Sequence, residues 1–74
     1  MPKPIKLKNV IKTLEERGFF SVSQRGSHKK FRKESKQTLN VIVKITENEI
    51  PYGTFKSILS QSKLKEEDFR KKKK

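Results

Sequence analysis

The stretch that decides the fold is FFSVSQRGSHKKFRK, which spans residues 19–33. Its first part, residues 19–25, alternates apolar and polar side chains, and this period of two is typical of a half-buried β-strand. Gly26 and Ser27 follow, and these residue types favour a tight turn. A second strand is expected from about residue 28 to residue 33. The stretch therefore predicts a β-hairpin.

Strand parity assigns the side chains of the hairpin to two faces, because successive residues of a strand point in opposite directions. In the first strand Phe20 and Val22 share one face. In the second strand Phe31 is expected to face the core, and parity then places three side chains on the opposite face: His28, Lys30 and Arg32. All five phenylalanines are predicted to be core residues rather than platforms for stacked bases: Phe19, Phe20, Phe31, Phe55 and Phe69.

Further patterned segments flank the hairpin. An extended lead-in at residues 1–4 is followed by a helix that Gly18 ends. The apolar stripe of this helix has the spacing i, i+3, i+4 and i+7: Leu7, Val10, Ile11 and Leu14. Residues 38–44 predict a third strand, because they are rich in β-branched residues. Its core face is expected to carry Leu39, Val41 and Val43, and its other face Asn40, Ile42 and Lys44.

Two helices are predicted after an irregular connector at residues 45–51. The first opens at Gly53, with Thr54 as its N-cap. Its apolar stripe consists of Phe55, Ile58 and Leu59. Residues 65–69 predict a short last helix with an acidic first turn.

The resulting order, α-β-β-β-α, predicts an α+β fold. A chain of 74 residues with 30% hydrophobic residues can bury only a thin core. We therefore expect a three-stranded antiparallel sheet with the helices packed on one face, which leaves the other face open and basic. A single domain is expected over residues 1–70, followed by a basic, disordered tail at residues 71–74.

The charge balance points to a polyanionic partner. Twenty Lys and Arg residues oppose eight Asp and Glu residues, which gives a net charge of +12. Nucleic acid is the first candidate, an acidic protein the second and an anionic membrane surface the third. No apolar run approaches the length of a signal sequence or a membrane span.

The residue types restrict the chemistry further. The chain has no cysteine, which excludes disulfides, zinc–thiolate sites and thiol nucleophiles and fits a cytoplasmic location. Dense acidic clusters for magnesium and a Walker-type phosphate loop are missing, so neither a two-metal nuclease nor any cofactor is expected. His28 is the single histidine, set among cations, and its imidazole can move protons near neutral pH. Taken alone, it is better interpreted as an ordinary surface histidine, because most lone histidines do no chemistry.

Four segments together resemble the HicA (YcfA-like) toxins of bacterial toxin–antitoxin modules. They are VIKTLEERGF at residues 10–19, QRGSH at residues 24–28, GTFKSIL at residues 53–59, and Leu64 with EEDF at residues 66–69. The resemblance covers nearly the whole chain in the family's order and spacing. It implies a fold like that of double-stranded-RNA-binding domains, a metal-independent endoribonuclease that cleaves mRNA, and a HicB antitoxin that covers the active-site surface.

The resemblance also assigns the site. The family's catalytic histidine corresponds to His28 through the Gly-Ser-His motif, with Gly26 and Ser27 as supporting residues. Many members carry a second histidine after the third strand, whereas residues 44–52 here contain none. Some members have Ser or Thr where this chain has Lys65. No histidine of this chain can therefore take the role of the family's second histidine.

RNA cleavage without a metal needs a base, an acid and cations around the phosphorus. His28 is predicted to be the general base, so the expected products are a 2′,3′-cyclic phosphate and a 5′-hydroxyl. The cations expected to bind the RNA phosphates are Arg25, Lys29, Lys30 and Arg32. The second proton-transfer group stays open between water, a lysine and Tyr52. Two other functions remain possible, a non-catalytic RNA-binding domain and a purely protein-interacting module.

Overall fold

A three-stranded antiparallel meander forms one layer of the molecule. The computed structural model describes residues 4–70, and the strands are β2 (Phe20–Arg25), β3 (His28–Glu34) and β4 (Thr38–Lys44), in the order β2-β3-β4. Each strand follows its neighbour through a short connection, as the hairpin pattern predicts. This confirms the three predicted strands.

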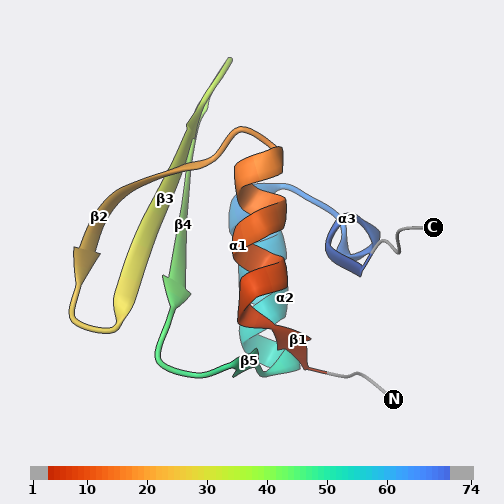
Figure 1. Cartoon of the computed structure of the whole chain (residues 1–74). Helices are drawn as coiled ribbons and strands as arrows, with labels where there is room; N and C mark the ends of the chain where they lie inside the picture. Colours follow the sequence, from red (N-terminus) through yellow and green to blue (C-terminus); the bar gives the residue numbers. More distant parts are fainter. Residues whose placement is uncertain (1–3, 71–74) are drawn as a thin grey trace.

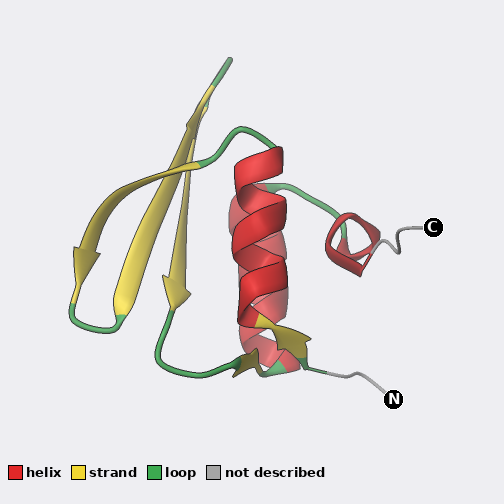
Figure 2. Ribbon diagram, viewed as in Figure 1, coloured by secondary structure: helices red, strands yellow, loops and turns green. Residues whose placement is uncertain are grey.

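Helices cover one face of this sheet only. Figures 1 and 2 show α1 (Leu7–Glu16) in front of α2 (Tyr52–Ser62), with both helices on the same side of the sheet. The short α3 (Glu66–Arg70) lies on the far side of these two helices, away from the strands (Figure 1). The predicted α+β class and α-β-β-β-α order are thus confirmed, with a face of the sheet left uncovered.

The core fills the space between the sheet and the helices. Its largest fully buried hydrophobic side chains come from both the sheet and the two long helices: Phe31, Phe55, Leu14, Ile58, Val10, Val41 and Val43. Phe19 and Phe69 are also buried, and the Phe69 ring meets the Phe55 ring edge-on at 5.3 Å between centroids. The predicted core faces of β3 and β4 are therefore correct.

The end of α1 is fixed by Gly18, as predicted. Gly18 has a φ of +97°. Glycine adopts this conformation readily because it has no Cβ atom. The N–H of Gly18 donates to the carbonyl of Glu15 at 3.2 Å, and the N–H of Phe19 donates to the carbonyl of Leu14 at 2.9 Å. This pair of bonds is a Schellman motif, which satisfies the last helical carbonyls and turns the chain into β2.

A second, two-stranded sheet was missed by the sequence interpretation. β1 (Ile5–Lys6) pairs antiparallel with β5 (Glu49–Ile50), so the expected irregular connector contains a strand. Ile5 and Ile50 face each other across this pair and are both buried. Strands of two residues carry no readable alternation, and only the docking of two distant segments creates them.

The alternation predicted for the first strand is wrong at Phe20. Ser21 pairs with Phe31 and Ser23 with Lys30, so a β-bulge between them adds Val22 to β2. An extra residue shifts the parity on one side of the bulge. Phe20 consequently lies on the uncovered face, opposite Arg32, and 46% of its surface is exposed. It is not a core residue.

The start of α2 also differs from the prediction. The helix begins at Tyr52 with Pro51 in the N-cap position, and no side chain caps it. Thr54 is therefore inside the first turn and is not the N-cap. Proline suits a helix start, because its fixed φ and missing N–H cost nothing there.

For α3, the N–H of Lys65 donates to the Asp68 Oδ2 at 2.9 Å, which is one half of a capping box.

Two predictions concern the chain ends. Residues 1–3 of the expected lead-in and the expected tail at residues 71–74 lie outside the described residues. Within residues 4–70, no helix is long and apolar enough to cross a membrane.

Candidate active site

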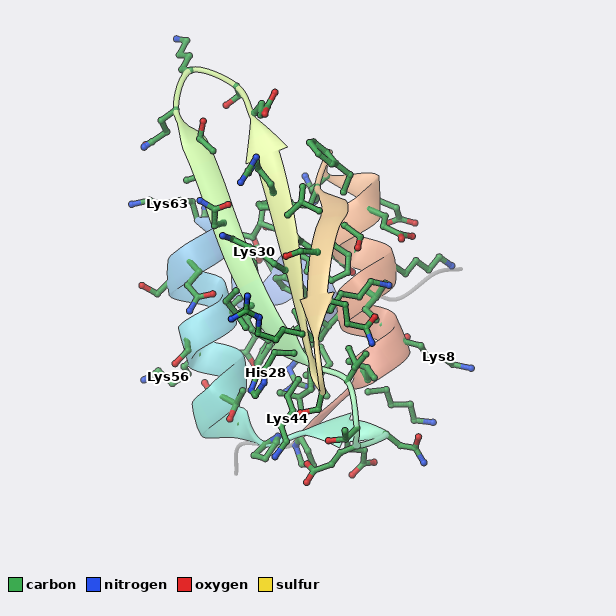
Figure 3. All side chains as sticks on the ribbon, turned by 90° about the vertical axis from the view of Figure 1, so that its left-hand side faces the viewer. Lys8, His28, Lys30, Lys44, Lys56 and Lys63 are labelled. Carbon is green, nitrogen blue, oxygen red and sulfur yellow. The ribbon has the colours of Figure 1, made fainter. Side chains whose placement is uncertain are left out.

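The register of the sheet aligns His28 with two cations. Arg25 of β2 and Lys44 of β4 are its direct cross-strand partners. Paired residues of an antiparallel ladder point to the same face, with their Cβ atoms about 5 Å apart. Figure 3 views the sheet from the side away from the helices and shows His28, Lys30 and Lys44 there. We call this uncovered side of β2, β3 and β4 the open face.

The tight turn between β2 and β3 fixes the position of His28. Gly26 has a φ of +60° and is the first of the two turn residues, which is the pattern of a type II′ hairpin turn. The carbonyl of Ser27 accepts a 2.8 Å hydrogen bond from the N–H of Ile45. The turn is thereby tied to the end of β4, and His28 is held as the first residue of β3. Both Gly26 and His28 are exposed.

The open face continues away from His28 in two further rows. Ser23, Lys30 and Ile42 form the second row, and these three side chains line a shallow hollow together with Arg25 and His28. The third row consists of Phe20, Arg32 and Asn40. There the Nε of Arg32 donates to the Oδ1 of Asn40 at 3.2 Å. The face thus changes from cationic at the turn to mixed aromatic and polar at the far end.

The charge of the open face is almost entirely positive. Glu34 is the single acidic residue of β2, β3 and β4, and it lies beyond the third row, paired with Thr38. Figure 3 shows further lysines at the margins of the sheet, Lys8 on α1 and both Lys56 and Lys63 on the α2 side. A surface with this distribution attracts a polyanion toward His28.

Most of the site residues predicted from the sequence come together. Arg25, Lys30 and Arg32 share the open face with His28, as parity predicts for the last two. Lys29 does not, because it points to the helix side, where its Nζ lies 5.6 Å from the centre of the Phe31 ring. Its predicted role in RNA binding stays a prediction, and Lys29 is not part of the candidate site.

Lys44 is the site residue that the sequence interpretation did not select. Parity placed it on the uncovered side of the third strand, but sixteen positions separate it from His28 in the chain. The register of the β3–β4 hairpin could have identified it. That register follows only once the length of the connection between Glu34 and Thr38 is known. Pairing of Glu34 with Thr38 brings Lys44 opposite His28.

Tyr52 is removed from the candidates for the second proton-transfer group. Its hydroxyl donates to the Oε1 of Glu66 at 3.2 Å, and Glu66 belongs to α3 on the far side of the helices (Figure 1). This hydrogen bond, together with the negative charge of Glu66, raises the pKa of Tyr52 above its usual value of 10.0. The tyrosine is therefore held in its neutral form, away from the open face.

The described part of the chain offers no preformed metal site. Among residues 4–70, no group of three or more His, Cys, Asp or Glu side chains gathers closely enough to hold a metal ion. What the open face offers instead is one imidazole flanked by cations. That set of groups can transfer a proton and neutralise a phosphate.

A comparison with models of protein families identifies the family to which the chain belongs. Residues 7–64 match the HicA toxin of bacterial toxin–antitoxin systems. The chain belongs to the HicA toxin family. A search of curated proteins finds no match. The HicA match runs from the start of α1 to the end of α2, and it contains all three rows of the open face. As a member of a toxin–antitoxin family, the chain is a toxin whose module supplies an antitoxin partner.

Proposed function

We propose that this HicA-family toxin is a metal-independent endoribonuclease that cleaves mRNA on the open face. The observation that carries the proposal is the row of Arg25, His28 and Lys44 across the three strands. It places the chain's single imidazole between two cations on an uncovered surface. A phosphodiester that binds to the cations meets the imidazole directly.

In the proposed reaction, His28 accepts the proton of a ribose 2′-hydroxyl. The 2′-oxygen forms a bond to the adjacent phosphorus, and the bond from phosphorus to the 5′-oxygen breaks. The departing 5′-oxygen takes up a proton, so the products are a 2′,3′-cyclic phosphate and a 5′-hydroxyl. No oxidant or cofactor is needed for this balance.

Lys44 is the favoured source of the second proton. Its position directly opposite His28 puts an ammonium donor beside the base on the same face. An ammonium group is a far stronger acid than the alcohol that leaves, so proton transfer to the 5′-oxygen is favourable. Water is the alternative donor, whereas Tyr52 lies on the other side of the helices.

The remaining residues of the site have binding and supporting roles in this proposal. Arg25, Lys30 and Arg32 bind phosphates and stabilise the charge that develops on the phosphorane. Gly26 provides the backbone conformation that the turn requires, and Ser27 ties the turn to β4 through its carbonyl. Both act by holding His28 in place.

The partner in the proposal is a HicB-like antitoxin. An acidic antitoxin surface on the open face would screen the same cations that bind RNA, so inhibition and substrate binding would compete. The family membership supports the existence of an antitoxin, and the positive charge of the open face supports an acidic contact surface.

The deciding experiment compares the wild type with His28→Ala on a long mRNA in excess EDTA. We expect cleavage by the wild type, products that end in a 2′,3′-cyclic phosphate, and a loss of at least about 100-fold in the variant. Circular dichroism checks that both proteins are folded. Full cleavage by His28→Ala would contradict the assignment. RNA binding without cleavage by either protein would favour the non-catalytic RNA-binding domain.

A further inference from the structure

Phe20 is the most exposed large hydrophobic side chain described, with 46% of its surface accessible to solvent. It lies in the third row of the open face, where the bulge at Ser21–Ser23 has turned it away from the core. Ile42 of the second row is the other exposed large hydrophobic residue among residues 4–70, at 41%. Both therefore lie on the same surface as His28, and neither contributes to the buried core.

The register gives the separation between Phe20 and His28. Phe20 pairs with Arg32, which is four residues along β3 from His28. At about 3.3 Å per residue, the two rows are about 13 Å apart. A stacked nucleic-acid strand rises about 3.4 Å per nucleotide, and an extended one roughly twice that, so the gap corresponds to about two to four nucleotides.

We propose that the open face binds single-stranded RNA lengthwise and that Phe20 stacks on an unpaired base about two to four nucleotides from the cleaved bond. This inference rests on the proposed function, because it takes His28 as the position of the scissile phosphate. It adds the substrate class, unpaired RNA, and a residue that holds it.

The chemistry of the three rows favours a single strand. Base-on-aromatic stacking needs the flat side of a base, which a duplex keeps inside its own stack. The cations of the first two rows would bind the phosphates, and Ile42 would contact the sugar or base between them. Arg32, oriented by its hydrogen bond to Asn40, lies next to Phe20 and offers a second planar group for stacking.

The charge of the face argues for RNA over an apolar protein contact at Phe20. Within two rows of Phe20 the open face carries three cations, Arg32, Lys30 and Arg25, against one acidic residue, Glu34, which lies in the next row beyond Phe20. Proteins that bind single-stranded nucleic acid use this combination, in which cations bind the phosphate backbone and an aromatic ring stacks on a base. A hydrophobic protein interface requires a larger continuous apolar patch.

A fluorescent variant tests the stacking directly. The chain contains no tryptophan, so Phe20→Trp introduces a single tryptophan, which can be excited selectively, at the proposed platform. In the His28→Ala background, which prevents cleavage, we expect an unpaired 20-nucleotide RNA of mixed sequence to quench this fluorescence. The same RNA as a perfect duplex is expected to quench little. Tyr52→Trp in the same background is the matched control, because that ring faces α3, and its fluorescence should not change.

Affinity measurements on Phe20 variants show whether RNA binding requires a planar ring or only a hydrophobic side chain. Loss of one stacked base lowers the affinity by about 5- to 150-fold. We expect this loss for both Phe20→Ala and Phe20→Leu, whereas Phe20→Tyr should bind single-stranded RNA like the wild type. Because Phe20 is exposed, all three variants should fold, which thermal unfolding by circular dichroism checks.

The outcomes distinguish the inference from the function on which it rests. Wild-type cleavage with unchanged RNA affinity in Phe20→Ala would overturn the stacking site and leave the ribonuclease intact. The same result with lost antitoxin binding would assign Phe20 to the protein partner instead. Failure of the wild type to bind any RNA would overturn both proposals. Tight binding to duplex but not to unpaired RNA would also overturn the inference.

Discussion

The two faces of the β2-β3-β4 sheet run along the same strands but have opposite chemistry. On the helix side, Phe31, Val41 and Val43 are fully buried under α1 and α2. On the open face, most side chains are polar or charged, with Phe20 and Ile42 as the exposed hydrophobic exceptions and with His28 and Lys44 paired at the turn end. The difference shows that one strand pattern specifies both the core and the candidate site, because alternate residues serve alternate faces.

Adjacent residues of β3 should give the largest contrast between the faces. Phe31→Ala removes a fully buried ring, and we expect a loss of about 3–5 kcal/mol in the free energy of unfolding. Arg32→Ala, one residue away on the open face, should change it by about 0.5 kcal/mol or less. Urea unfolding followed by circular dichroism measures both. Similar losses in the two variants would contradict the assignment of faces.

Two lysines on opposite faces should differ in cleavage. Lys44→Ala is expected to lower kcat by about 100-fold, because it removes a charged donor beside the reacting phosphate. Lys29→Ala removes the same charge from the helix side and should lower kcat by less than about threefold, through weaker general attraction. Single-turnover cleavage of a defined mRNA measures both rates. Equal losses would mean that net charge, and not position opposite His28, matters.

The turn that joins β2 to β3 should be sensitive to a single methyl group. Gly26→Ala places a Cβ at a φ of +60°, which costs about 1–2 kcal/mol of stability. The cost arises from the backbone alone, because a Cβ there would meet no atom within 4 Å. Chemical unfolding gives the stability loss. An unchanged stability would show that the turn tolerates another conformation.

The smallest effect is expected farthest from the open face. Arg17 at the end of α1 donates to Asp68 of α3 at 2.8 Å, and both side chains are partly exposed. Solvent screens such a pair, so Arg17→Ala should cost less than about 1 kcal/mol. Cleavage should be unchanged. A clear loss of cleavage would reveal a coupling between α3 and the open face.

The strands, the helices and most of the site could be predicted because their signals are local. The i, i+3, i+4, i+7 stripe placed α1, Gly18 ended it, and parity around Phe31 put His28 and Lys30 on one face. The failures have two causes. The pairing of β1 with β5 depends on contacts between segments that are distant in sequence, whereas the bulge beside Phe20 depends on how β2 pairs with β3 inside the hairpin.

What the sequence by itself determined was the α-β-β-β-α order, the excess of positive charge, and the motif that surrounds His28. These follow from periodicity and residue type, which short-range sterics and burial make readable. Only the tertiary structure decided which side chains join the histidine. The register brought Lys44 to His28, the bulge exposed Phe20, and docking of α3 drew Tyr52 away. Each depends on how strands pair and helices pack in the folded chain, and a linear pattern does not encode that arrangement residue by residue.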